Sequence, residues 1–280
     1  MSLHILVVYD RIDLRRNRFF ARALRESAEV RGLSAQILTS EELQRSDLPS
    51  DSAASTRLRK PRVVLSRSRD LELRRSLESR GIPVVSPSEI LAVANDKVET
   101  ERFARTIGVP ALTIASNLNP AKPPMGYPFI LKDRFGHGGS SVRLIKTAED
   151  YHTTLTGLPA IAWVAQPYLP TATLEARAYI LGRSRPWTIE KISRDGLRSN
   201  LSFGATTRLS SLDDNAAHVV EACRSQLPDG FYGIDIVWDQ DKRPLLHEIE
   251  DPVGTRALYQ HGIDAARAVI DYISELIYLS

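Results

Sequence analysis

Cysteine is nearly absent from this chain of 280 residues, in which Cys223 stands alone. A single thiol cannot form an internal disulfide framework, and it argues against a zinc cluster, which needs several thiol or imidazole ligands. Residues 215–226 have the periodicity of an amphipathic helix, so we expect Cys223 to be a small buried side chain and not a catalytic thiol. The chemistry must therefore come from other residue types.

Long apolar runs are also missing. The apolar segment 3–9 has the length of a buried strand and is too short to span a bilayer. The sequence shows no signal peptide and no low-complexity tract. We therefore expect a cytoplasmic protein without a membrane partner.

A strong basic excess is lacking too, since the formal net charge is only +3. Arginines gather at 11–25 and 57–69, but a nucleic-acid site would interleave them with exposed aromatic side chains. Phe19 and Phe20 are expected to face the core instead. The sequence predicts no nucleic-acid partner and favours an anionic substrate or an acidic carrier.

Two acidic segments have the alternation of β-strands. In 233–236, Ile234 and Ile236 can face a core while Asp235 points the other way; Glu248 and Glu250 likewise share one face of a second strand. If the two strands pair as a hairpin around 239–244, three carboxylates converge. Such a cluster is tolerable with a cation between its members, and magnesium carrying a nucleotide phosphate is the favoured occupant. A hairpin with a solvated acidic face is the alternative.

A glycine-rich loop lies between two apolar strands upstream. The first strand, 127–132, ends in Lys132, and residues 136–141 read Gly-His-Gly-Gly-Ser-Ser before the second strand begins. Glycines allow backbone N–H groups to approach phosphates, and a nearby lysine offsets their charge. The spacing is neither Walker A nor a dinucleotide fingerprint. An ordinary hairpin turn is the alternative, and His137 is expected to contact phosphate or solvent and not to act as a general base.

With Asn95-Asp96-Lys97 before these segments, the ordered set resembles the ATP-grasp superfamily, and RimK-like carboxylate–amine ligases are the most similar members. The resemblance covers about residues 84–265. Only seven lysines stand against thirty arginines, yet Lys97 and Lys132 fall where the family places its phosphate-contacting lysines. No Ser/His/Asp or Cys/His arrangement competes with this interpretation.

The resemblance implies an ATP-dependent C–N ligase that forms an amide through an acyl phosphate, releasing ADP and phosphate. It implies nucleotide contacts from Lys97, Lys132, Gly138, Gly139, Ser140, Ser141, Gln166, Pro167, Tyr168, Leu169 and Glu175. It places Mg²⁺ or Mn²⁺ on Asp235, Glu248 and Glu250, and it assigns Arg177, Arg194 and Arg256 to the acyl phosphate or the substrate carboxylate. A surface ion pair with Glu175 is the alternative for Arg177.

The fold class expected is α/β with an α+β grasp body. Strands alternating with helices predict a parallel sheet in residues 1–85, which resemble the preATP-grasp domain. We expect a central lid subdomain with the glycine-rich loop over 86–165 and a subdomain with the metal site over 166–280. Helices are expected at 14–31, 71–79 and 88–107.

One departure concerns the substrate. Glu250 stands where similar proteins carry Asn; it could tighten metal binding or pair with Arg256. The sequence therefore does not specify the amine acceptor or the acid, which is either free or borne on a peptide or carrier protein. It also leaves open a homo-oligomer. An ATP-grasp kinase or carboxylase, or a non-catalytic nucleotide-binding module, are the alternative functions.

Overall fold

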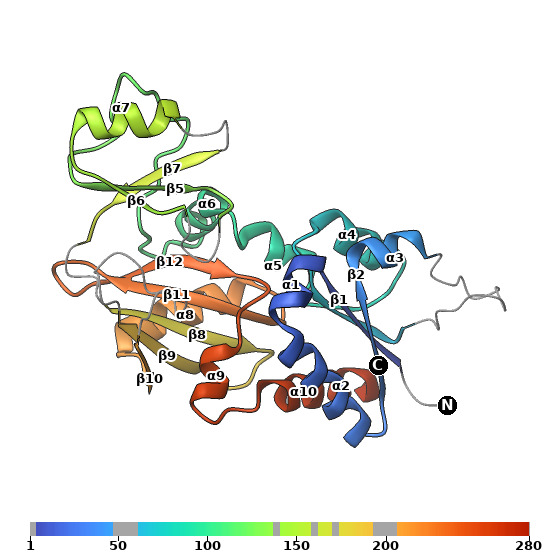
Figure 1. The fold of residues 1–280 in the computed structure, drawn as a ribbon. Helices are drawn as coiled ribbons and strands as arrows, with labels where there is room; N and C mark the ends of the chain where they lie inside the picture. Colours follow the sequence, from blue (N-terminus) through green and yellow to red (C-terminus); the bar gives the residue numbers. More distant parts are fainter. Residues whose placement is uncertain are drawn as a thin grey trace.

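The chain folds around three β-sheets that follow one another along the sequence (Figure 1). The computed structural model describes residues 4–46, 61–136, 141–157, 162–169, 174–192 and 206–279. Helices and strands alternate through this part of the chain, which confirms the predicted α/β class. None of the described helices is long and apolar enough to cross a membrane.

The first sheet is parallel, as the sequence predicts, with the spatial order β2-β1-β3-β4. Its strands are β1 (His4–Tyr9), β2 (Ser34–Thr39), β3 (Val63–Arg67) and β4 (Val84–Val85), and its helices are α1 (Arg11–Arg16), α2 (Arg18–Val30), α3 (Ser40–Arg45) and α4 (Leu71–Ser79). The short helix α3, which the sequence analysis missed, begins with a capping box between Thr39 and Glu42.

The prediction of one helix over 14–31 is wrong, because Asn17 separates α1 from α2. The backbone N–H of Asn17 donates to the Asp13 carbonyl at 2.9 Å, and its side-chain amide donates to the same oxygen at 2.8 Å. Asparagine competes for backbone groups in this way, which favours a helix boundary. The chain thus turns between residues 16 and 18.

The expected helix over 88–107 is also divided, into α5 (Ser88–Val93) and α6 (Lys97–Ile107). Asp96 caps α6, since its carboxylate accepts hydrogen bonds from the N–H groups of Val98 and Glu99. The Arg134 guanidinium donates a hydrogen bond to each oxygen of the Asp96 carboxylate at 2.7 Å. These bonds fix the start of α6 against the end of β5.

The second sheet is small and antiparallel, with the order β6-β5-β7. It contains β5 (Phe129–Asp133), β6 (Arg143–Ile145) and β7 (Trp163–Pro167), with α7 (Ala148–Gly157) packed on one side. A core of its own surrounds Phe129 and Tyr151. Figure 1 shows this lobe beyond α6, at one end of the molecule.

The third sheet has the order β10-β9-β8-β11-β12. It contains β8 (Leu174–Leu181), β9 (Trp187–Ile192), β10 (Thr206–Ser210), β11 (Phe231–Trp238) and β12 (Pro244–Glu250), and α8 (Asp214–Gln226) packs against it together with α5 and α6. Ile234, Ile236 and Ile249 lie in this core, as the alternation predicts. Cys223 is also buried there, which confirms its predicted role as a core side chain.

The end of the chain returns to the first sheet through α9 (Arg256–Gln260) and α10 (Ala265–Leu279). Helix α10 lies beside α2 in Figure 1, and the two are in contact. Val269, Ile270 and Ile273 are fully buried and share one core with residues of α2, β1 and β3. Each such side chain contributes about 1.5–3 kcal/mol by leaving water. The first sheet is therefore stabilised by the last helix of the chain.

Two arginines attach the first sheet to the loop that follows β12. Arg74 is fully buried; it forms an ion pair with Asp251 and donates to the Ser86 carbonyl at 3.0 Å. Arg67 donates to the Val253 carbonyl at 2.5 Å. These contacts fix the path of residues 251–253, which lead to the candidate site described below.

Replacing Arg74 by Met should lower the free energy of unfolding by about 3–5 kcal/mol, because Asp251 would be left as a buried carboxylate without its partner. Arg75→Met is the matched control: Arg75 is exposed and, among the described residues, pairs only with Glu72, so we expect a change within about 0.5 kcal/mol. Urea denaturation measures both. Equal losses in the two variants would show that the buried ion pair does not hold the loop.

Candidate active site on the charged face of the five-stranded sheet

Strands β11 and β12 form the predicted hairpin. Asp235 lies directly opposite Glu248, and Gly233 opposite Glu250. Since Ile234 and Ile249 face the core, the three carboxylates belong to the other face of the sheet. The prediction that these acidic residues share one face is confirmed.

Arg177 on β8 lies between two of these carboxylates. It is opposite Asp235 in the register, donates to both Asp235 oxygens at 2.6 Å and forms an ion pair with Glu250. Burial lowers the pKa of Arg177, but Asp235 and Glu250 together raise it well above its ordinary value. The ion pairs that Arg177 makes are with Asp235 and Glu250, and Glu175 pairs with Lys191. Within the described residues, no ion pair joins Glu250 to Arg256.

Gly233 makes room for this arginine. A Cβ atom at Gly233 would lie 2.8 Å from Val253 Cγ2 and 3.2 Å from Arg177 Cδ. The Gly-Ile-Asp-Ile segment therefore supplies space as well as a carboxylate.

Glu175 on β8 pairs with Lys191 of β9. Lys191 also lies 3.5 Å from Asp235, so it links the carboxylates of two strands. Burial raises the pKa of Glu175, but Lys191, His247 and Arg177 outweigh this effect and hold that pKa well below its usual range. Glu175 is thus a carboxylate anion with a cation beside it.

His247 is a site residue that the sequence analysis missed. Asp235 is opposite Glu248, but Ile236 is opposite Leu246, so His247 is the extra residue of a β-bulge. The bulge places His247 on the charged face next to Glu248, whereas strict alternation would send it to the core. Its Nε2 lies 3.2 Å from Lys132 Nζ and its Nδ1 lies 3.5 Å from Glu175 Oε2.

Lys132 and Lys97, the two predicted phosphate contacts, reach this face from outside the sheet. Burial outweighs the attraction of Glu248 and lowers the pKa of Lys132 to about 8. Lys97 lies 3.5 Å from Glu248 and donates to the Gly136 carbonyl at 2.7 Å, at the entrance of the glycine-rich loop. The two lysines therefore join the lobe, helix α6 and the five-stranded sheet.

The predicted nucleotide contacts at 166–169 lie at the end of β7. Gln166 is buried, and its Oε1 has no hydrogen-bond partner among the described residues. Pro167 ends the strand, and half-buried Tyr168 and Leu169 follow it. An unpaired buried acceptor is costly, so this position fits a ligand that carries an N–H donor. Adenine has such a group.

Some predicted residues fall outside the part of the chain that the structure describes. They are His137, Gly138, Gly139, Ser140 and Arg194. Ser141 is described and lies in a turn just before β6.

The predicted metal ligands are oxygen donors of the type that Mg²⁺ and Mn²⁺ prefer. In the described residues, however, no three acidic, histidine or cysteine side chains are grouped closely enough to hold a metal ion. Arg177 binds Asp235 and Glu250, and Lys97 is the cation nearest to Glu248. A metal would have to compete with these cations for the carboxylates.

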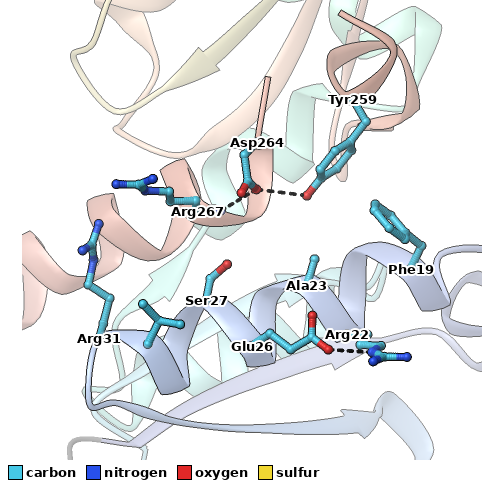
Figure 2. Close-up of a pocket in the computed structure, with 10 residues that line it drawn as sticks. Phe19, Arg22, Ala23, Glu26, Ser27, Arg31, Tyr259, Asp264 and Arg267 are labelled. Atoms are coloured by element: carbon cyan, nitrogen blue, oxygen red, sulfur yellow. Dashed lines mark hydrogen bonds and ion pairs between the residues drawn. The ribbon is translucent and has the colours of Figure 1, made fainter. Parts of the chain in front are cut away.

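A pocket of about 270 Å³ adjoins Arg177. It is lined from the third sheet and α9 by Lys191, Glu250 and Arg256, and from the α1–α2 junction by Arg16 and Asn17. A second pocket, of about 720 Å³, lies between α2 and the start of α10 (Figure 2). Among its charged groups, Arg22 pairs with Glu26 at 2.6 Å and Arg31 pairs with Asp271. None of the predicted site residues is among its described lining residues.

The comparisons with known proteins agree with this geometry. Residues 91–273 match the RimK-like ATP-grasp domain. The chain belongs to the RimK-like ATP-grasp family, which confirms the resemblance and the predicted ATP-grasp fold.

Two curated relatives and two solved structures define the similarity. Uncharacterized protein MG011 of Mycoplasma genitalium is 31% identical over 91% of this chain and 86% of its own length. Glutamate–LysW ligase ArgX of Sulfurisphaera tokodaii is 25% identical over 71% of this chain and 75% of its own. A RimK domain ATP-grasp protein from Sphaerobacter thermophilus has a TM-score of 0.71 at 20% identity, covering 96% of this chain and 98% of its own. D-alanine–D-alanine ligase from Bacillus anthracis has a TM-score of 0.73 at 13% identity, covering 99% of this chain and 98% of its own.

The low pKa of Lys132 predicts proton uptake when nucleotide binds. Phosphate oxygens favour the charged amine, so binding should raise this pKa from about 8 toward its ordinary value. Near pH 8.5, a non-hydrolysable ATP analogue should bind with net proton uptake, and its Kd should weaken as the pH rises further. Calorimetry in two buffers of different ionisation enthalpy measures the uptake. Lys132→Arg should bind without it, since guanidinium stays charged; unchanged uptake in this variant would assign the proton to another group.

Proposed function

We propose that this protein is an ATP-dependent carboxylate–amine ligase that forms an amide bond through an acyl phosphate. The observation that carries the proposal is an unbroken series of contacts across the sheet face. It runs from Lys132 through His247, Glu175 and Lys191 to Asp235 and Arg177. The series thus leads from a predicted phosphate contact to the wall of the pocket beside Arg177. A phosphoryl donor and an acid could meet along it.

In this proposal, nucleotide binds between the lobe and the five-stranded sheet. Lys97 and Lys132 offset the charge of the phosphates, and Gln166, Pro167, Tyr168 and Leu169 hold the adenine end. Gly138, Gly139, Ser140 and Ser141 would cover the phosphates with backbone N–H groups and exclude water. The role of Glu175 is to hold Lys191 and His247 next to the nucleotide.

The reaction has two displacements. A carboxylate oxygen of the acid attacks the γ-phosphorus of ATP, and ADP leaves. The amine then attacks the acyl carbon, phosphate leaves with the bonding electrons, and the amine nitrogen loses a proton to the released phosphate or to water. Arg177, with Arg194, is proposed to hold the reacting carboxylate and the oxyanion that develops on it, and Arg256 is proposed to hold a carboxylate of the substrate. No side-chain nucleophile is needed.

Asp235, Glu248 and Glu250 are the proposed ligands of Mg²⁺ or Mn²⁺, which would neutralise charge on the transferring phosphoryl group when bound. Because Arg177 and Lys97 occupy these carboxylates in the structure, phosphate is expected to draw the lysine away and free Glu248.

The acid is proposed to be anionic beyond its reacting group, since arginines line the pocket. The name of the relative glutamate–LysW ligase states a ligation of glutamate. A small amino acid, free or joined to a peptide or carrier protein, fits a pocket of about 270 Å³.

The function is tested with the purified chain, ATP and Mg²⁺, and a panel of acids and amines. ADP formation should require both an acid and an amine, and mass spectrometry should detect the amide. ADP formation without an amine would indicate a kinase. Nucleotide binding without turnover on a wide panel would favour a non-catalytic module.

Lys132→Met should weaken ATP binding by about 1–3 kcal/mol, the scale of a charge-assisted contact. Lys146→Met is the control, because Lys146 is exposed and lies after β6, away from the charged face. Nucleotide titration of both variants measures the difference. Equal affinities in the two variants would show that Lys132 does not contact the nucleotide.

Glu248→Gln should abolish turnover while the thermal unfolding midpoint changes little, since Glu248 is partly exposed and its one ion pair with a described residue is long, at 3.5 Å. The amide keeps the size of the side chain but loses the charge that a magnesium ligand supplies. Turnover close to that of the unmodified protein would show that Glu248 holds no metal.

A further inference from the structure

The pocket beside Arg177 is shared by two distant parts of the chain. Arg177, Lys191 and Glu250 belong to the third sheet, and Arg256 begins α9. Arg16 and Asn17 come from the α1–α2 junction of the first domain, more than 150 residues earlier in the sequence. The pocket therefore exists only where the first domain meets the third sheet.

The cations of the pocket fall into two groups. Arg177 and Lys191 are buried or nearly so and already bind carboxylates of the sheet. Arg16 and Arg256 are exposed, and neither has an ion pair or a side-chain hydrogen bond within the described residues. Glu250 is the only carboxylate among the described lining residues, and it is bound to Arg177. Two positive charges are therefore left without a partner at the pocket.

The α1–α2 junction holds Arg16 in place. The backbone N–H and the side-chain amide of Asn17 each donate to the Asp13 carbonyl, and the Asp13 carboxylate pairs with Arg69. Asp10 accepts the Arg69 backbone N–H at 2.9 Å, so the junction is tied to the end of β3. Asn17 thus acts as a positioning residue, because its side-chain amide donates to the Asp13 carbonyl within the turn.

We propose that Arg16 and Arg256 form an anion subsite that binds a carboxylate of the substrate other than the reacting one, which makes Arg16 a specificity-determining residue of the first domain. The role of this subsite in the reaction rests on the proposed function, but the binding of an anion to it does not. An anion between the two guanidinium groups would neutralise charges that have no ion-pair partner among the described residues, and each guanidinium can donate two parallel hydrogen bonds to a carboxylate. The second carboxylate could belong to the acid or to the amine acceptor.

The test compares glutarate with glutaramate, its half-amide, as binding probes for the full chain. The two have the same length and differ by one charge. A bound carboxylate with charge-assisted hydrogen bonds should give glutarate an affinity about tenfold higher or more. Arg16→Gln and Arg256→Gln should each reduce this preference strongly. Arg15→Gln, an exposed arginine of the same helix that does not line the pocket, should retain it.

Steady-state kinetics then assign the source of the carboxylate. Arg16→Gln should raise KM for the acid if the acid carries the second carboxylate, or KM for the acceptor if the acceptor carries it, with KM for ATP unchanged. The subsite is overturned if the unmodified protein shows no preference for glutarate, if Arg16→Gln keeps the full preference, or if Arg15→Gln loses as much. Loss of the preference in Arg16→Gln in a protein that joins no acid to any amine would support the subsite and contradict the ligase function.

Discussion

Balanced charge on one face of the five-stranded sheet is the constraint on which the candidate site depends. Four cations meet four carboxylates there: Lys97, Lys132, Arg177 and Lys191, and Glu175, Asp235, Glu248 and Glu250. Removing one member of the close buried pairs, Arg177–Asp235 and Lys191–Glu175, leaves an uncompensated charge at a cost of about 3–5 kcal/mol, so these four side chains depend on one another. In the proposed function, a polyphosphate that attracts the lysines would release carboxylates for a metal ion.

Much of the fold follows from local patterns in the sequence. The parallel first sheet, helix α4 and the β11–β12 hairpin were predictable because apolar periodicity and flanking turns fix them. The helix breaks at Asn17 and at residues 94–96 were not, since they depend on side chains that compete for backbone groups. Helix α10 was also missed, although its apolar residues form the core shared with α2.

The site was predictable in its residue types but not in its pairings. Asp235, Glu248 and Glu250 share the predicted face, yet the partner of Arg177 could not be read from β8 alone, because it is set by the register with β11. His247 was hidden by the bulge, which reverses the face of one residue without a sequence signal. Arg16 lines the pocket beside Arg177 only because α1 lies next to the third sheet, which no local pattern in the sequence predicts. Contacts between distant segments therefore account for what local patterns could not supply.

The transfer of oxygen from acid to phosphate tests the central claim most directly. An acid that supports ADP formation is labelled with ¹⁸O in its reacting carboxylate and incubated with ATP, Mg²⁺ and the amine. If an acyl phosphate forms, one labelled oxygen must move to the inorganic phosphate, because the bond between the acyl carbon and the bridging oxygen breaks when the amine attacks. Mass spectrometry should find phosphate carrying a single ¹⁸O. Unlabelled phosphate formed in step with the amide would contradict the account.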